Sequence, residues 1–439
     1  MMQRRTLCAA AGIASLGVHA AADDAFSRAA AEAPSMAGVA VPLAYFGTHF
    51  HRLVARPGNA PPPTQWVDAM VGSLRLWDAG TRWGDVAPQA GVWNFDRMDA
   101  YVAAAEAHGA SVLYTLGSTP RWASARPDEP GPYGPGCAAE PVKLAHWEEY
   151  VRRVAERYRG RIQAYELWNE PHFSDYALDR QHPGFFTGSV AHMVDFARVA
   201  RGVLDRVDPA ALLTTPGFVN GPHRLDLFLR SGGAQWVQVV AYHFYARDGL
   251  QFVQQVVDVR GVMRRQGLAG LPLWNTECGV ETYEDHESLP EGIMQRPTGD
   301  QAAATLAQFL LLGAAVRMDR FFYYAWDNYR SGMVDRHGRR TPRFEALLRV
   351  EQWLLGTHLQ GVALVGNSVV IRGARGVERF IFAWSELDRL ERIDVPVGWK
   401  VAACETLPGV AVQTCALAAD GALQVALSPA PMRLRLVRA

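Results

Sequence analysis

Between residues 40 and 357 the sequence alternates eight times between strand-like and helix-like patterns, and this alternation limits the possible folds more than any other feature. The strand-like runs are short and rich in β-branched and aromatic residues, whereas the helix-like runs repeat apolar residues three and four positions apart. A chain that repeats strand and helix in this way forms a parallel sheet covered by helices. The expected strands lie within 46–50, 73–78, 111–116, 162–171, 212–215, 237–242, 271–276 and 321–326, and the expected helices are 65–71, 94–108, 143–158, 189–207, 223–230, 250–266, 301–318 and 343–355.

Eight strand and helix pairs predict a (β/α)8 TIM barrel, an α/β fold, rather than an open nucleotide-binding sheet. No glycine-rich phosphate-binding loop follows any of the expected strands. After about residue 358 the pattern changes to short runs with a period of two, which predicts strands at 368–372, 379–384, 393–397, 410–414, 423–427 and 432–437. We therefore expect a barrel at 40–357 and a small C-terminal all-β, sandwich-like domain at 358–439, which a strand from residues 23–40 could complete.

The N-terminus has the pattern of an export signal. Arg4 and Arg5 precede an apolar run from Leu7 to Val18, and small residues follow it, so residues 1–22 are expected to be a signal peptide. Both the general and the twin-arginine route fit this pattern, and either predicts a periplasmic or secreted bacterial protein. The apolar run 302–316 is shorter than the roughly 20 residues of a membrane span, so we expect a buried helix and no stable membrane insertion.

Charge and cysteine content exclude several classes of partner. The 44 basic and 44 acidic residues cancel, so no basic field predicts binding to nucleic acid. The 13 tryptophans provide faces on which sugars can stack. Of the four cysteines outside the signal, Cys404 and Cys415 are the expected disulfide pair. No cysteine or histidine pair has metal-ligand spacing, so neither a metal nor another cofactor is expected.

Two carboxylates are expected at the rim of the barrel. The fourth strand ends in Asn169-Glu170-Pro171, and the seventh ends near Glu277 in the stretch 274–279. In a (β/α)8 barrel the carboxyl ends of the strands converge on the active site. Opposed positions at this rim would bring the two carboxyl groups to the roughly 5 Å separation of a retaining glycosidase.

The segment Tyr-Glu-Leu-Trp-Asn-Glu-Pro at 165–171, the Thr-Glu pair at 276–277 and the His-Phe-Tyr triplet at 243–245 resemble the clan A glycoside hydrolases. Within the clan the chain most resembles family 39, which contains β-xylosidases, α-L-iduronidases and enzymes that cut bacterial exopolysaccharides. The resemblance covers roughly residues 40–439. It implies that Glu170 is the general acid/base, that Glu277 is the nucleophile and that Asn169 holds the 2-hydroxyl of the sugar.

The resemblance also implies a surrounding set of substrate-binding residues. Tyr245 would hydrogen-bond the nucleophile, and Arg75 would lie near it and pair with Glu166, which we interpret as structural. Trp326, at the end of the eighth strand, is the expected sugar-stacking platform, with core packing as its alternative. The other expected contacts are His49, Trp122 and His243; Tyr133, His172 and Phe173 could line outer subsites, Asp327 and Asn328 could touch substrate, and Trp93 is expected to be packing.

These residues together predict a cofactor-free retaining glycoside hydrolase that cleaves β-glycosidic bonds. Because the chain has few inserted loops to close a pocket, we expect endo action on a bacterial exopolysaccharide. An exo-β-xylosidase-like enzyme is the main alternative. A non-catalytic carbohydrate-binding protein would tolerate the loss of a carboxylate, but both are present. A metal-dependent hydrolase would need a cluster of histidine and aspartate at the strand ends, where the sequence has only scattered histidines.

Overall fold

The barrel is present in the computed structural model, which describes residues 24–29, 39–55, 63–66, 71–179, 184–283, 287–288, 296–365, 367–408, 415–417 and 423–439. Eight parallel strands form one sheet in the order β5-β4-β3-β2-β1-β8-β7-β6. Parallel bridges between Thr214 and Val239 and between Phe218 and Tyr242 link the two ends of this sheet, so the barrel is nearly closed. The strands are β1 (Phe46–Thr48), β2 (Ser73–Leu76), β3 (Ser111–Thr115), β4 (Ala164–Glu166), β5 (Leu212–Thr214), β6 (Val240–His243), β7 (Leu273–Cys278) and β8 (Arg320–Tyr323).

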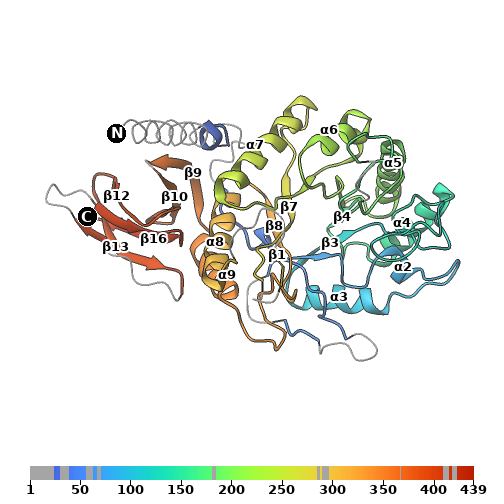
Figure 1. The fold of residues 1–439 in the computed structure, drawn as a ribbon, viewed down its shortest axis with the longest axis horizontal. Helices are drawn as coiled ribbons and strands as arrows, with labels where there is room; N and C mark the ends of the chain where they lie inside the picture. The colour runs from blue at the N-terminus through green and yellow to red at the C-terminus, as the bar shows by residue number, and fades with distance from the viewer. Residues whose placement is uncertain are drawn as a thin grey trace, which may run out of the picture.

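Helices cover the outside of the barrel (Figure 1). Their apolar residues follow the predicted helical spacing: in α4, Trp147, Val151 and Val154 are all fully buried. Polar caps define several of the starts, as in α8, where Thr298 and Gln301 form a capping box. The helices are η1 (Leu43–Tyr45), α2 (Trp83–Val86), α3 (Asp96–Ala107), α4 (Leu144–Arg157), α5 (Val190–Val207), α6 (His223–Arg230), η2 (Gly233–Trp236), α7 (Gly249–Arg265), α8 (Gly299–Ala315) and α9 (Pro342–Leu354).

The helix expected at 65–71 is not confirmed. Gln65 and Trp66 are not helical, and residues 67–70 lie outside the described part of the chain. The ring of Trp66 packs on Phe50 at 4.9 Å and stacks on His108 at 4.4 Å. These tertiary contacts hold the tryptophan in a loop over the barrel, where the local helical pattern alone would have placed it on a helix.

The interior of the barrel is a packed apolar layer. Leu113, Ala164, Val239, Trp274 and Phe322 come from five different segments of the sheet and contact one another in one buried cluster. Side chains from so many strands meet only inside the barrel. This layer closes the barrel below the strand ends, so polar groups at the ends face the open rim.

The C-terminal region is an antiparallel β-sandwich. One sheet has five strands in the order β13-β16-β11-β10-β9, and the other has three in the order β12-β15-β14. The strands are β9 (His358–Val365), β10 (Ser368–Arg375), β11 (Glu378–Ser385), β12 (Arg389–Ile393), β13 (Trp399–Thr406), β14 (Cys415–Leu417), β15 (Leu423–Leu427) and β16 (Met432–Arg438). The expected all-β, sandwich-like region is therefore confirmed, and Figure 1 shows it at one end of the molecule beside α8 and α9.

The five-stranded sheet is buried on both faces. Along β11, Phe380 and Phe382 join the core that continues into the barrel, whereas Ile381 and Ala383 join a second core with the three-stranded sheet. The alternation of side chains along a strand produces this division. The ring of Trp353 on α9 lies 6.1 Å from that of Phe382, so the barrel and the sandwich share one continuous apolar interior.

Several strand predictions for this region need correction. The strands β9, β13 and β14 were not predicted, and of the expected strand 393–397 only Ile393 is in a strand. The expected strand 410–414 and the expected signal peptide at 1–22 lie outside the described residues. Residues 24–29 form a helix rather than a strand that completes the sandwich, because Ala25, Phe26 and Ala29 bury one helical face in the core.

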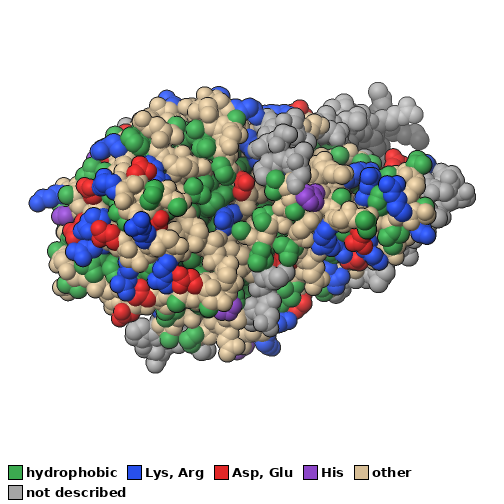
Figure 2. Space-filling model, turned by 180° about the vertical axis from the view of Figure 1, so that it is seen from behind, with side chains coloured by type: hydrophobic (Ala, Val, Ile, Leu, Met, Phe, Trp, Pro, Cys, Tyr) green, Lys and Arg blue, Asp and Glu red, His purple; other side chains and the backbone are tan. Residues whose placement is uncertain are grey.

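Cysteine chemistry and surface charge agree with the sequence where they can be compared. Cys404 is disulfide-bonded, and the side chain of its expected partner Cys415 lies outside the described residues. Cys137 and Cys278 are free and buried. Among the described residues, no helix is both long and apolar enough to cross a membrane. On the face seen in Figure 2, basic and acidic side chains are interspersed.

Candidate active site

The polar side chains of the candidate site come from the carboxyl ends of the barrel strands. Arg75 lies on β2, Glu277 on β7 and His243 at the last position of β6, while Glu170 follows the end of β4 by a short loop. Because the strands run parallel, their carboxyl ends meet at one rim. The barrel therefore brings these residues together although they are far apart in the sequence.

The backbone at Glu170 has a special conformation. Its φ of 40° lies in the left-handed region, which costs a non-glycine residue on the order of 1 kcal/mol or more. Two hydrogen bonds maintain it: the N–H of Glu170 donates to the carbonyl of Gly217 at 2.9 Å, and the N–H of Gly217 donates to the carbonyl of Trp168 at 2.8 Å. The segment after β5 thus fixes the direction in which the Glu170 side chain leaves its loop.

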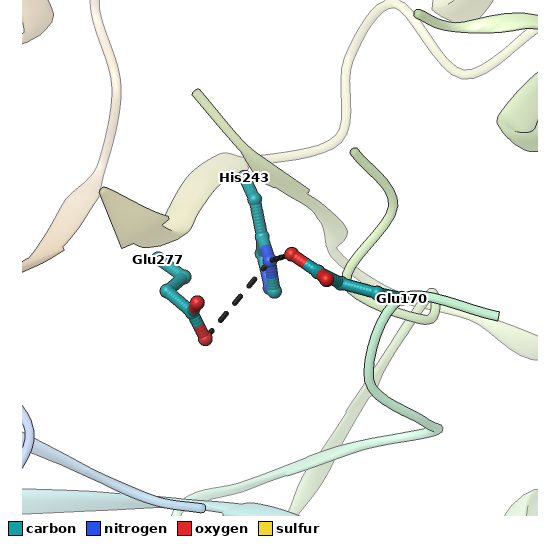
Figure 3. Close-up of side chains that lie close together, drawn as sticks. All are labelled: Glu170, His243 and Glu277. Carbon is teal, nitrogen blue, oxygen red and sulfur yellow. Dashed lines mark hydrogen bonds and ion pairs between the residues drawn. The ribbon is translucent and has the colours of Figure 1, made fainter. Parts of the chain in front are cut away.

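Glu170 and Glu277 lie close together on either side of His243 (Figure 3). One oxygen of each carboxylate and one ring nitrogen of His243 all lie within 4.8 Å of one another. Retaining glycosidases place their carboxyl groups roughly 5 Å apart, whereas inverting enzymes leave roughly 6.5–9.5 Å for a water molecule. The separation fits attack by one carboxylate and protonation by the other.

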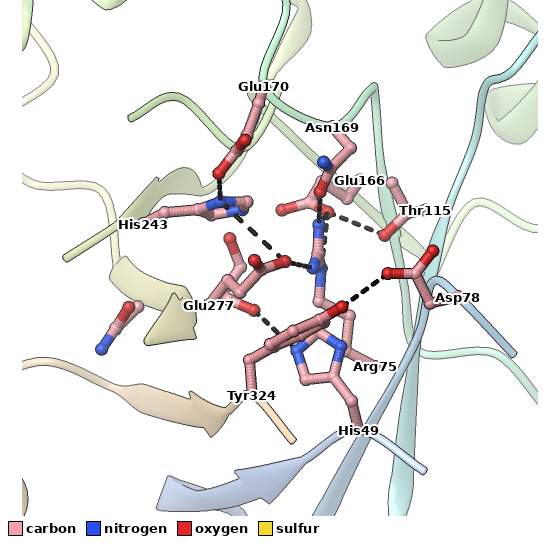
Figure 4. A network of polar contacts seen from close by, with 12 residues as sticks. His49, Arg75, Asp78, Thr115, Glu166, Asn169, Glu170, His243, Glu277 and Tyr324 are labelled. Carbon is pink, nitrogen blue, oxygen red and sulfur yellow. Dashed lines mark hydrogen bonds and ion pairs between the residues drawn. The ribbon is translucent and has the colours of Figure 1, made fainter. Parts of the chain in front are cut away.

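The fully buried guanidinium of Arg75 connects Glu277 to residues at the end of β4 (Figure 4). It donates to Glu277 Oε2 at 2.7 Å, to Glu166 Oε2 at 2.8 and 2.5 Å, and to Asn169 Oδ1 at 2.7 Å. The Thr115 hydroxyl donates to the same Glu166 oxygen at 2.7 Å. The expected pair of Arg75 and Glu166 is present. Since Asn169 accepts from Arg75 through its oxygen, its amide N–H groups stay available to a sugar hydroxyl.

Opposing effects act on the charge of Glu277. Burial raises the pKa of Glu277, while His243, Arg75 and the hydrogen bond from Tyr245 lower it. The Tyr245 hydroxyl donates to Glu277 Oε1 at 2.9 Å, as the resemblance implied. Burial, followed by the charge of Glu277, raises the pKa of Tyr245 well above its ordinary value, so this hydroxyl keeps its proton and remains a donor. Both oxygens of Glu277 thus face donors that favour the ionised form.

Burial by itself would lower the pKa of the Arg75 guanidinium, but its two carboxylate partners reverse that effect. The charges of Glu166 and Glu277 and their hydrogen bonds outweigh burial and raise the pKa of Arg75 above its ordinary value. A permanent cation therefore lies 2.7 Å from the carboxylate that would attack the sugar. A buried ion pair of this kind is sensitive to the loss of either partner, because the remaining charge has no compensation.

His243 contacts Glu170 rather than the open pocket. Its Nδ1 lies 2.8 Å from Glu170 Oε1 and 4.0 Å from Glu277 Oε2. The residue is only 1% exposed. The expectation that His243 binds substrate directly therefore needs correction: its buried ring holds Glu170 in place.

Within the described residues, Glu170, His243 and Glu277 are also the one group of acidic, cysteine or histidine side chains arranged so that a metal ion could bind. His243 donates to or accepts from Glu170, and Arg75 and Tyr245 donate to Glu277. These hydrogen bonds account for the close approach of the two carboxylate oxygens and the histidine nitrogen. They are also the contacts that a general acid and a nucleophile would need.

Trp326 is not the sugar-stacking platform. It is completely buried, with its ring 5.1 Å from that of Phe50 and 5.6 Å from that of Phe344, so its alternative role in core packing holds. The strand β8 ends at Tyr323, and the next residue, Tyr324, turns toward the rim instead. Its hydroxyl donates to Asp78 Oδ2 at 2.7 Å. Burial, followed by the charges of Asp78 and Glu277, raises the pKa of Tyr324. The aromatic run 321–326 indicated such a residue without showing which ring faces the site.

His49 also needs correction as a direct substrate contact. His49 is completely buried, and burial, followed by the charge of Arg75, lowers its pKa well below the ordinary value. Its Nε2 lies 3.2 Å from the carbonyl oxygen of Thr276, so it supports the strand next to Glu277. The indole N–H of Trp122 donates to the carbonyl of Ala87 at 2.8 Å, which anchors the loop after β3, and its role as a substrate contact stays a prediction.

An open pocket of about 480 Å³ lies beside Tyr324. Asp78, whose φ is 36°, accepts hydrogen bonds from Tyr133 at 2.6 Å and from Tyr324 at 2.7 Å. The guanidinium of Arg82 lies 3.9 Å above the ring of Tyr133. All four residues line the pocket. The sequence analysis named Tyr133 but missed Asp78, Arg82 and Tyr324; the position of Asp78 at the end of an expected strand was a signal for it.

The remaining candidates divide between the pocket and the core. Asp327 and Asn328 line the pocket, but the carboxylate of Asp327 is occupied by backbone N–H groups of His51 and Arg52 at 2.8 and 2.9 Å. Phe173 is completely buried, so it packs rather than lining a subsite, and His172 does not line this pocket. Trp93 stacks on Phe95 at 5.9 Å, as expected for packing.

Comparison with known proteins gives matches at the level of structure. No family model matches the sequence, and no curated protein is significantly similar to it. A family 39 glycoside hydrolase from the gut symbiont Bacteroides cellulosilyticus has a TM-score of 0.65 and 18% identity, over 84% of this chain and 76% of that chain. The family 39 enzyme from Xanthomonas axonopodis pv. citri has a TM-score of 0.61 and 16% identity, over 92% of this chain and 96% of that chain.

A family 30 subfamily 8 xylanase from Clostridium acetobutylicum has a TM-score of 0.57 and 14% identity, over 90% of this chain and 96% of that chain. Coverage this wide includes the barrel and most of the β-sandwich. At these identities the likeness concerns the arrangement of the backbone. The chain therefore has the fold of the clan A glycoside hydrolases of families 39 and 30.

Proposed function

We propose that this protein is a retaining β-glycoside hydrolase in which Glu277 is the nucleophile and Glu170 the general acid/base. The observation that carries the proposal is the approach of the two carboxylates, with oxygens within 4.8 Å, at the carboxyl rim of a (β/α)8 barrel. The fold shared with families 39 and 30 supports it. The donors on Glu277 and the histidine on Glu170 give the two carboxylates different surroundings, as their different roles require.

The first step forms a bond between a Glu277 oxygen and the anomeric carbon and breaks the bond from that carbon to the leaving oxygen. Glu170 transfers its proton to this oxygen, so the leaving group departs as an alcohol. Arg75 and Tyr245 hold Glu277 in position from below, and the amide of Asn169 is placed to donate to a sugar hydroxyl. The product of this step is a glycosyl ester on Glu277.

The second step returns the enzyme to its starting state. Once Glu277 is esterified its negative charge is lost, and the ionised Glu170 removes a proton from water. The water oxygen bonds to the anomeric carbon, the ester bond breaks, and Glu277 leaves as a carboxylate stabilised by Arg75. Two inversions at one carbon give net retention.

Endo action on an extended β-linked glycan is supported by the hollowed surface around Tyr324. The pocket of about 480 Å³ shares Val54 and Arg82 with a neighbouring hollow of about 650 Å³, and it shares Arg52 with another of about 560 Å³. Neighbouring hollows would suit successive sugar units of one chain, whereas an exo enzyme would enclose a single chain end. With the expected signal at 1–22, the proposed substrate is a bacterial exopolysaccharide met outside the cytoplasm.

The testing experiment compares wild type and Glu277→Ala on aryl β-glycosides and bacterial exopolysaccharides, with product length and anomeric configuration followed by NMR. We expect oligosaccharides released with retention by the wild type and none by the variant. Release of single sugars would favour the exo-β-xylosidase alternative, and inversion would contradict the mechanism. Binding without turnover by the wild type would favour a carbohydrate-binding protein.

A further inference from the structure

Two polar atoms next to the carboxylate pair are buried and have no hydrogen-bond partner among the described residues: His243 Nε2 and Glu166 Oε1. The other atom of each group is fully engaged. His243 Nδ1 contacts Glu170 at 2.8 Å, and Glu166 Oε2 accepts from Arg75 and Thr115. A buried polar atom that lacks a partner costs free energy, so two of them in one place call for a physical explanation.

Gly217 shows that the two atoms face the same small space. A Cβ on this glycine would lie 2.3 Å from His243 Nε2 and 2.9 Å from Glu166 Oε1. Both atoms are therefore close to one point, near enough to be joined by a small rotation or by one water molecule, which spans two hydrogen bonds of about 2.8 Å. Any larger residue at 217 would fill this space. The glycine thus permits contact between the histidine and the second carboxylate.

The chemistry of the two groups fixes which of them donates. Glu166 is paired with the cation of Arg75, so it is held ionised and its Oε1 only accepts. Its partner must then carry the proton, which places a hydrogen on Nε2 of His243. In the neutral ring Nδ1 is left as the acceptor that faces Glu170. Glu170 can then share its catalytic proton with Nδ1, and the pair keeps that proton inside the site until a leaving group takes it.

We propose that Glu166 is a positioning residue that keeps the proton of His243 on Nε2, so that Nδ1 and Glu170 together hold the catalytic proton. The proposal rests on the proposed function of Glu170. The other charged and titratable groups near the ring are Glu277 at 4.0 Å, Arg75, which binds both glutamates, and the buried His49. None of these contacts Nε2, so the proton on that nitrogen is assigned to Glu166.

A direct test is the protonation state of His243 in solution, read by ¹⁵N NMR of histidine-labelled protein and assigned with His243→Phe. We expect Nε2 to carry the ring proton at pH 7 in the wild type. In Glu166→Gln we expect a mixture of two tautomers, one with the proton on Nε2 and one with it on Nδ1. An unprotonated Nε2 in the wild type would overturn the proposal. This readout needs no turnover, so its failure is distinct from a failure of the proposed glycosidase activity.

The pH profile gives the functional test. Removing the buried negative charge of Glu166 weakens retention of the shared proton, so the basic limb of kcat/KM on a poor leaving group should move down by about one pH unit in Glu166→Gln. Glu281→Gln, the same change at an exposed carboxylate after β7, is the matched control and should leave the basic limb unchanged.

A double-mutant comparison separates the proposed path from a general charge effect. If Glu166 acts through the ring, the shift caused by Glu166→Gln disappears in a His243→Phe background. An equal shift in both backgrounds would show that Glu166 acts without His243 and would overturn the proposal. Circular dichroism of each variant, compared with wild type, verifies that the site is measured in folded protein.

Discussion

The two carboxylates at the rim, Glu170 and Glu277, differ mainly in the residues that each one contacts. Glu277 accepts hydrogen bonds from Arg75 and Tyr245, whereas Glu170 contacts His243 and keeps part of its surface exposed. The donors to Glu277 oppose the rise in its pKa that burial causes, and the partly exposed setting of Glu170 lets a proton move to and from a substrate. Division of labour between two identical side chains thus follows from their partners.

Loss of each carboxylate should have a different kinetic signature. In Glu170→Ala, kcat/KM should fall about 10²–10⁴-fold for poor leaving groups and much less for an activated aryl glycoside, which needs no protonation. Azide should restore turnover of the aryl substrate by replacing the base-assisted water. Glu277→Ala should lose both activities. Glu281→Gln, an exposed carboxylate on the adjacent loop, is the control. Equal losses of kcat/KM on both substrates in Glu170→Ala would contradict its role.

The acidic limb of the pH profile should depend on Tyr245. Activity falls as Glu277 gains a proton, and burial has raised the pKa of this group, so the acidic limb lies above the ordinary range of a glutamate. The Tyr245 hydroxyl lowers that pKa, so Tyr245→Phe should move the acidic limb up by about one pH unit. Kinetics of kcat/KM against pH measure the shift. Tyr165→Phe, which removes a buried hydroxyl without a partner among the described residues, should leave it unmoved.

At the scale of elements, the barrel strands position the carboxylates of the candidate site, and the helices pack against the outside of these strands. β7 extends to Cys278, so Glu277 is fixed by the sheet itself, while Glu170 depends on a loop held by Gly217. The helices that follow begin at definite caps, and α8, with most of its length buried, packs against α9 and the β-sandwich. Its start therefore affects both halves of the molecule.

The capping box of α8 offers an element-scale prediction. Thr298 accepts a hydrogen bond from the N–H of Gln301 at 3.2 Å, so Thr298→Ala should reduce the free energy of unfolding by about 1 kcal/mol. Urea denaturation followed by circular dichroism measures the change. Thr305→Ala, an exposed change inside the same helix, should be neutral or slightly stabilising because alanine favours helix. Equal destabilisation by both changes would argue against a role for the cap.

At the scale of the whole molecule, the barrel and the β-sandwich share one interior. Trp353 is completely buried, packs near Phe382 and donates its indole N–H to Glu405 at 3.1 Å. Gln308 on α8 donates to the carbonyl of Pro429 at 2.7 Å. Apolar and polar contacts thus cross the same boundary, and the sandwich supports the helices that follow the last two strands.

Removing the central ring of this boundary should weaken both parts together. Trp353→Ala should cost about 3–5 kcal/mol of unfolding free energy, since it leaves a cavity and removes the indole hydrogen bond to Glu405. Calorimetry should show one transition, shifted to lower temperature. Trp236→Ala, a partly buried tryptophan on η2 of the barrel, is the control and should cost less. Two separate transitions in the wild type would contradict a shared core.

The sequence by itself determined the number and order of the barrel strands and the position of both carboxylates at their ends. Periodicity is a local property, and a residue at the end of a parallel strand must lie at the rim. For the same reason the pairs of Arg75 with Glu166 and of Tyr245 with Glu277 were predictable once the resemblance was named.

Only the tertiary structure decided which side chains face the pocket. Tyr324 rather than Trp326 reaches the rim, and His49 and His243 are buried, because packing against distant residues fixes each ring. The space shared by Glu166 and His243 depends on the missing side chain of Gly217, more than twenty residues from either. Such contacts arise from the closure of the barrel, so no local pattern in the chain encodes them.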